Sequence, residues 1–164
     1  MNAKDVIANA LDLNYSVMTN YLSDLTDADL LIRPAPGANH IAWQLGHLIS
    51  SEMNVFLKEI PGAKVPELPA GFAQQHSKET AKSESTAGFL KKEEYLGLFK
   101  KVREATKAAL AGLSEADLDK PITGPMAKYS PTVGKLLVLT ASHVMMHAGQ
   151  FTVVRRRLGK PVLF

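Results

Sequence analysis

Hydrophobic residues recur every three or four positions over four separate stretches of the chain, which is the spacing of an amphipathic helix. The first stretch covers about residues 3–25, and the second begins near Asn39 and stops at the Pro61–Gly62 break. The third covers about residues 87–112 and the fourth about 132–158. Nowhere do four or more β-forming residues alternate with polar ones, so no strand is predicted. The pattern therefore predicts an all-α protein.

Residues 61–88 show neither helical nor alternating periodicity. Pro61, Pro66 and Pro69 interrupt the first half of this segment, and serine and threonine enrich the second half. These features predict an extended crossover between the second and third helices. Because so long a connection lets those two helices run parallel, we expect an up-down-down-up four-helix bundle. The whole chain, residues 1–164, is interpreted as a single domain of this kind.

Two similar short segments follow the first and third helices. They read LTDADLLIRP at residues 25–34 and LSEADLDKP at residues 113–121. In each segment a hydroxyl residue stands three positions before an aspartate, as Thr26 before Asp29 and Ser114 before Asp117. This spacing is typical of a capping box. We therefore expect each segment to form a capped turn that redirects the chain toward the next helix.

The composition excludes several classes of protein. The absence of cysteine excludes disulfide frameworks, thiolate metal clusters and a cysteine nucleophile. A net charge of +3, from 19 basic and 16 acidic residues, is too small to indicate nucleic-acid binding. The N-terminus lacks the apolar core of a signal peptide, and the longest apolar run falls far short of the roughly 20 residues that span a bilayer. We expect a cytoplasmic protein with no nucleic-acid or membrane partner.

Two of the five histidines stand four residues apart on the fourth helix. They are His143 and His147, in the segment SHVMMHAGQ, and this spacing places both imidazoles on one face. The apolar stripe of this helix comprises Val133, Leu136 or Leu137, Thr140, Val144, His147, Phe151, Val154 and Leu158. His147 falls within the stripe and His143 beside it. Both imidazoles are therefore predicted to face the bundle interior.

A third imidazole is available on the second helix, where His47 follows Gly46 on the side of the apolar stripe. The glycine is expected to allow a close approach between helices. Three neutral imidazoles can supply three metal ligands and leave a position for water or substrate, as in catalytic zinc sites. Because no cysteine is present, the ligands are nitrogen and oxygen only. Zinc, nickel, manganese, cobalt and iron all fit such a site, and affinity order alone does not choose among them. Zinc or nickel is our first expectation.

The alternative interpretation is that these histidines only form hydrogen bonds in the core. Burying three inward imidazoles without an ion is costly, and this cost favours the metal. His40 lies on the same face as His47 but about 10 Å along the helix axis. We therefore expect it at the mouth of the site or on the surface. His76, in the crossover, is expected to be solvated.

The sequence does not identify catalytic or cofactor-binding residues. Val144, Met145 and Met146 separate the paired histidines, so the general base of an HExxH motif is absent. Any base must come from elsewhere or be hydroxide on the metal. Polar residues on the predicted stripes are candidates for contacts to the site or to substrate, or else are satisfied internally: Asn14, Thr140 and Gln150. The run Arg155–Arg157 is interpreted as favourable charge at a helix C-terminus, with an anion site as the alternative.

Two segments together resemble the DinB/YfiT-like superfamily of metal-binding four-helix bundles. They are IAWQLGHLISSE at residues 41–52 and SHVMMHAGQFTVVRRRLGKP at residues 142–161. The most specific element is H-x3-H-x-GQ, followed by an arginine-rich turn and LGKP. The resemblance implies that one histidine of the second helix and two of the fourth bind a divalent metal, namely His47, His143 and His147. It also implies an up-down-down-up bundle and a homodimer.

The resemblance leaves the reaction open. Relatives include transferases and isomerases that use low-molecular-weight thiols such as bacillithiol or mycothiol, and others are described as metal-dependent hydrolases. We favour a metal-dependent enzyme that acts on a small molecule, of the thiol S-transferase or hydrolase type. One alternative is a non-catalytic metal- or ligand-binding bundle. Another is a dimeric interaction protein without metal, whose histidines form hydrogen bonds in the core.

Overall fold

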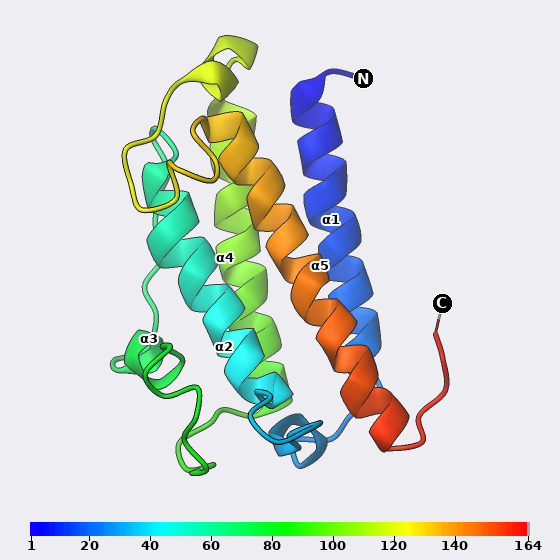
Figure 1. Ribbon diagram of the computed structural model, residues 1–164. Helices are drawn as coiled ribbons and strands as arrows, with labels where there is room; N and C mark the ends of the chain where they lie inside the picture. Colours follow the sequence, from blue (N-terminus) through cyan, green and yellow to red (C-terminus); the bar gives the residue numbers. More distant parts are fainter. Residues whose placement is uncertain (164) are drawn as a thin grey trace.

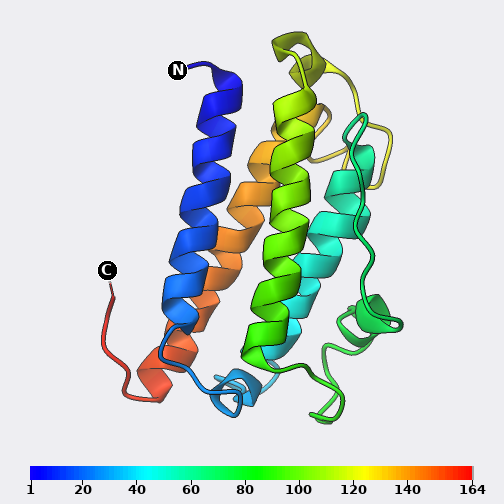
Figure 2. The ribbon, with the colours of Figure 1, turned by 180° about the vertical axis from the view of Figure 1, so that it is seen from behind.

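The computed structural model describes residues 1–163 and confirms the all-helical class and the four-helix bundle (Figure 1). The four long helices are α1 (Ala3–Leu22), α2 (Ile41–Ser51), α4 (Lys92–Gly112) and α5 (Val133–Arg157). In Figure 1, α1 and α5 run from top to bottom, whereas α2 and α4 run the other way. Seen from behind in Figure 2, α4 lies beside α1 and the crossover descends along α2. Helices α2 and α5 are therefore antiparallel neighbours.

Short elements extend or connect the long helices. Helix α2 continues into a π-helical turn, η2 (Glu52–Phe56), and a 3₁₀ turn, η3 (Leu57–Glu59). The crossover is not extended throughout, because it contains one helical turn, α3 (Phe72–Gln75), that packs on α2. The remaining 3₁₀ turns are η1 (Asp29–Leu31) and η4 (Glu115–Asp119).

Both predicted capped turns are confirmed. The Thr26 amide donates to the Asp29 carboxylate at 2.8 Å, and the Asp29 amide donates back to the Thr26 hydroxyl at 3.2 Å. Ser114 and Asp117 make the same reciprocal pair at 2.7 and 3.3 Å. The Ser114 box caps η4, and the Thr26 box forms the turn that leads into η1.

Three predicted helix boundaries were wrong by a few residues. The first helix ends at Leu22 rather than Leu25, because the chain already turns toward the box at Thr26. The second is capped by His40 instead of Asn39, since the His40 Nδ1 accepts from the Trp43 amide at 3.1 Å. The third begins at Lys92 rather than residue 87, because Gly88 has a left-handed φ of 79° that interrupts the helix.

Apolar side chains from all four long helices fill the interior. A charged pair also lies there: Arg103 on α4 donates to the Glu52 carboxylate at 2.8 Å, and both side chains are at most 4% exposed. By length and composition alone, α5 could cross a membrane, with a mean hydropathy of 1.2 over its most apolar window. However, α5 packs against α1 and α2 and contributes many of the buried core residues, as a core helix of a bundle does.

The arginine run at the end of α5 has a structural role that the sequence did not indicate. Arg155 is buried, pairs with the Asp24 carboxylate, and donates to the Tyr21 carbonyl at 2.8 Å. Arg157 donates to the carbonyls of Arg33 and Pro34. The two guanidinium groups thus bind the end of α5 to the end of α1 and to the segment that follows it. These contacts are additional to any interaction with the helix dipole.

This arrangement predicts an acid-dependent loss of stability. The bond from Arg155 lowers the pKa of Asp24 in the folded protein, so the pair stabilises the fold above the ordinary aspartate pKa. This stabilisation is lost as the pH falls through the lowered pKa of Asp24, because the carboxyl group then becomes protonated. Because the carboxylate is partly in water, Asp24→Asn should cost about 1 kcal/mol at pH 7. Urea unfolding at pH 7 and in strong acid measures this. If Asp24→Asn were less stable than the wild type by the same amount in strong acid, the prediction would be contradicted.

Candidate metal centre

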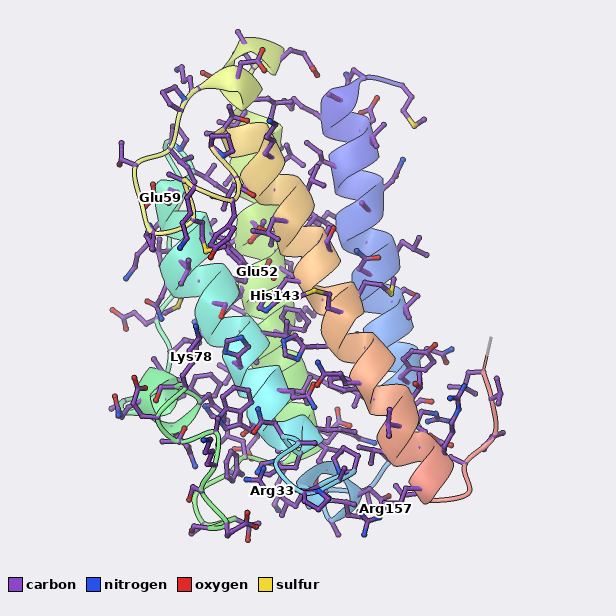
Figure 3. The ribbon with its side chains drawn as sticks, viewed as in Figure 1. Arg33, Glu52, Glu59, Lys78, His143 and Arg157 are labelled. Carbon is purple, nitrogen blue, oxygen red and sulfur yellow. The ribbon has the colours of Figure 1, made fainter. Side chains whose placement is uncertain are left out.

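The structure brings His47, His143 and His147 together between α2 and α5. One ring nitrogen from each lies within 4.8 Å of those of the other two. The ring centroids are 5.2 Å apart for His47 and His143 and 4.9 Å apart for His143 and His147. Figure 3 labels His143 in this region, where α5 faces α2. The predicted clustering of these three imidazoles is therefore correct.

Helical geometry and aromatic packing position the three rings. His143 and His147 lie one turn apart on α5, so both reach the antiparallel helix α2. The Trp43 indole stacks on His47, with centroids 5.0 Å apart and planes inclined by 6°. The Phe56 ring meets His143 edge-on at 5.8 Å. These contacts restrict the rotation of two of the imidazoles before any ligand binds.

Gln44 orients His147, and the sequence analysis missed it. Its side-chain amide donates to the Asn39 carbonyl at 2.8 Å, so its oxygen faces the His147 Nδ1 at 2.8 Å. Since an amide oxygen only accepts, the His147 Nδ1 carries the proton and its Nε2 keeps a free lone pair. Metal-binding histidines are commonly fixed in this way. The available signal was a polar residue one turn before His47 on an otherwise apolar stripe.

The three imidazoles are neutral at physiological pH. Burial lowers the pKa of His143 to about 4 and that of His147 to about 3. Burial also lowers the pKa of His47, with a smaller contribution from the Lys78 charge, whereas a hydrogen bond to the His76 backbone acts in the opposite direction. Neutral imidazoles have the lone pairs that a metal ligand requires.

The other two histidines have both ring nitrogens engaged in hydrogen bonds. His40 is buried rather than at the surface, because it caps α2 and also bonds the Leu30 backbone. The prediction that His76 is solvated was likewise wrong. Its Nδ1 donates to the Phe72 carbonyl at 2.7 Å, and its Nε2 accepts from the Tyr95 hydroxyl at 2.8 Å. Neither ring therefore has a free lone pair.

Gly46 makes room for the crossover rather than for another long helix. A Cβ at this position would lie 2.1 Å from the His76 ring. The crossover therefore packs directly against α2, one residue before His47. Sequence periodicity could not reveal this contact, because it depends on how an irregular segment docks.

The polar candidates from the sequence do not line the site. Asn14 is buried and donates to the Ala141 carbonyl at 2.8 Å, while the Thr140 hydroxyl donates to the Leu136 carbonyl at 2.9 Å. Both are satisfied internally. Gln150 was placed on the core stripe, but it is exposed because the stripe passes through His147 and Phe151 instead.

The donor set fits a divalent transition metal. It consists of imidazole nitrogens only, which suit zinc, nickel, cobalt or iron better than calcium or magnesium. Nitrogens bound to one tetrahedral ion lie about 3.3 Å apart, so nitrogens now within 4.8 Å of one another would need to approach by at most about 1.5 Å. Three protein ligands leave at least one position for water or substrate.

Because Gln44 forms a hydrogen bond with His147, we predict that replacing Gln44 changes the affinity for metal. Gln44→Leu removes the acceptor of the His147 proton, and the affinity for zinc should fall about 10- to 100-fold. Gln44→Glu keeps an acceptor oxygen at this point and should retain most of the affinity. Isothermal titration of the three proteins with zinc measures both effects. Equal affinity in the leucine variant would show that Gln44 does not orient the ligand.

Comparison with known proteins identifies the family. The sequence profile of the DinB superfamily matches residues 10–151, which is most of the chain. The chain belongs to the DinB superfamily. This agrees with the resemblance inferred from the two histidine segments. No curated protein matches the chain significantly.

Solved structures of other proteins share the DinB-like fold. One is YfiT from Bacillus subtilis, described as a probable metal-dependent hydrolase with an unusual four-helix bundle topology. It is 19% identical, with a TM-score of 0.70 over 96% of this chain and 89% of that one. Another is a conserved protein from Enterococcus faecalis, 19% identical, with a TM-score of 0.68 over 98% and 99% of the two chains. At this identity the likeness establishes the fold alone.

Proposed function

We propose that this DinB-superfamily protein is a divalent-metal-dependent enzyme that acts on a small molecule. The observation that carries the proposal is the cluster of three neutral imidazoles, His47, His143 and His147, with donor atoms within 4.8 Å. The same residues are the predicted ligands. Core hydrogen bonds engage one nitrogen of His147, with Gln44, and one of His47, with the His76 backbone, so the second nitrogen of each ring is left to bind an ion.

Each group of residues at the proposed metal site would have its own role. The three imidazoles would hold the ion, and Gln44 would keep the His147 lone pair directed inward. Trp43 and Phe56 would exclude water from two sides of the rings and limit their motion. When bound, the metal would act as a Lewis acid that lowers the pKa of a coordinating water or thiol.

Two reaction types are consistent with this site. Hydrolysis is supported by the description of YfiT as a probable metal-dependent hydrolase. Transfer to a low-molecular-weight thiol is compatible with the chain, which has no cysteine and would take the nucleophilic sulfur from a cofactor. We place hydrolysis first because a structural relative supports it.

A paired activity screen tests the proposal. The zinc- and nickel-loaded proteins would be assayed with ester and amide substrates, and with an electrophile plus a thiol. We expect saturable turnover that chelation abolishes and added metal restores. His143→Ala should be inactive, whereas the exposed neighbour Gln150→Ala should retain activity. Turnover that survives chelation, or that persists in His143→Ala, would contradict the proposal.

We also propose a cytoplasmic homodimer. Exposed apolar side chains on the outer sides of α1 and α5 would suit contact with a second copy: Val6, Leu13, Val138, Met145 and Val153. Sedimentation analysis of the wild type and of Val138→Glu tests this. We expect a dimer that the glutamate dissociates, and a monomeric wild type would contradict the assembly.

A further inference from the structure

The crossover is fixed beside the candidate metal centre at two points. At the first, the buried His76 ring lies where a side chain on residue 46 would otherwise project. Two hydrogen bonds, to the Phe72 carbonyl and from the Tyr95 hydroxyl, hold that ring. This part of the crossover therefore has a defined position against α2, next to His47.

The second point is Thr80. Its hydroxyl accepts from the Trp43 indole N–H at 3.3 Å and donates to backbone carbonyls of its own segment. Trp43 in turn stacks on His47. The residues between the two anchors, 77–79, are consequently held alongside that imidazole.

Lys78 stands in the middle of this short segment. Lys78 is exposed, and its side chain makes no hydrogen bond or ion pair within residues 1–163. Figure 3 shows it on the crossover next to α2. Burial is the main cause of the lowered pKa of His47, and the Lys78 charge adds to it. The adjacent Glu79 is also exposed, and the Lys78 charge is among the causes that lower its pKa, after local hydrogen bonding.

A metal-loaded centre would carry an excess of positive charge. Within residues 1–163, the group of side chains close enough to hold an ion consists of the three imidazoles, and no carboxylate belongs to it. Neutral imidazoles leave a divalent ion with its full charge, and the lysine adds another positive charge. An anion entering the site would therefore be attracted by both.

We propose that the site takes a small organic anion, with a carboxylate as the simplest case, and that Lys78 holds its negative charge beside the open metal position. The proposal deepens the metal-dependent function above and rests on it. Lys78 thus acts as a substrate-positioning residue that favours anionic over neutral compounds. The lysine is supplied by the crossover, whereas the imidazoles come from α2 and α5.

Anion binding to the cobalt-loaded protein tests this directly. Acetate and its uncharged analogue acetamide would be titrated at constant ionic strength while the visible absorption of cobalt is followed. The variants are Lys78→Gln, Lys78→Arg and, as the matched control, Lys101→Gln, which changes an exposed lysine on α4. Cobalt content is measured for each protein.

We expect acetate to bind more tightly than acetamide. Because Lys78 is exposed, Lys78→Gln should weaken acetate binding about two- to fivefold. Acetamide affinity and cobalt content should stay unchanged, and Lys78→Arg and Lys101→Gln should bind acetate as the wild type does. Equal affinities for acetate and acetamide, or a Lys78→Gln variant that binds acetate normally, would overturn the proposal alone. A wild type that takes up no cobalt would overturn the proposed function together with it.

Discussion

Replacing Glu52 with methionine is expected to lower the free energy of unfolding by about 3–5 kcal/mol. The substitution leaves the Arg103 guanidinium buried among apolar side chains without its carboxylate, and the Thr106 hydroxyl also loses an acceptor. Of the original bonds of Arg103, only the one to the Leu11 carbonyl remains. Urea unfolding of the purified variant measures the loss.

The double variant Glu52→Met, Arg103→Met is the control. With both charges removed, an apolar pair of similar volume fills the space, and most of the stability should return. If the single variant were as stable as the wild type, the pair would not be buried as described. If the double variant were as unstable as the single one, lost packing rather than the unpaired charge would be the cause.

Replacing His147 with alanine is expected to weaken zinc binding by about 100-fold, because structural zinc sites gain about 10–16 kcal/mol from four ligands, or about 3 kcal/mol each. Isothermal titration measures this, and thermal unfolding monitored by circular dichroism confirms that the bundle is intact. Gln150→Ala, on the same helix but exposed, should bind zinc as the wild type does. Unchanged affinity in His147→Ala would exclude this residue as a ligand.

The sequence alone predicted the features that depend on helical periodicity. The inward position of His147 followed from its place in the apolar stripe of α5, and the one-turn spacing brought His143 with it. His47 followed from the stripe of α2. These inferences succeed because a helix fixes the direction of each side chain relative to its neighbours. The capped turns at Thr26 and Ser114 were predictable for the same reason, since a capping box is local.

Features that depend on the crossover could not be predicted in this way. His76 lies in a segment without periodicity, so nothing local indicated that its ring packs at Gly46. Lys78 owes its position to the same docking. The role of His40 depended on which of two adjacent residues caps α2, and local patterns rarely decide a boundary so finely.

Gln44 is an intermediate case. Its place on the apolar stripe of α2 was visible in the sequence, and a buried amide needs a partner. Its actual partner, His147, lies 103 residues further along the chain. Only the antiparallel packing of α2 on α5 identifies that contact. A polar residue one turn from a candidate ligand is thus a signal that sequence analysis can use.

The most direct test of the account is the metal content of the tag-free protein, measured by elemental analysis beside His47→Ala and His143→Ala. We predict close to one equivalent of zinc, nickel or another divalent transition metal per chain in the wild type. Both variants should lose it while keeping their helical content. A wild type that is metal-free and also fails to take up added zinc or nickel would contradict the account.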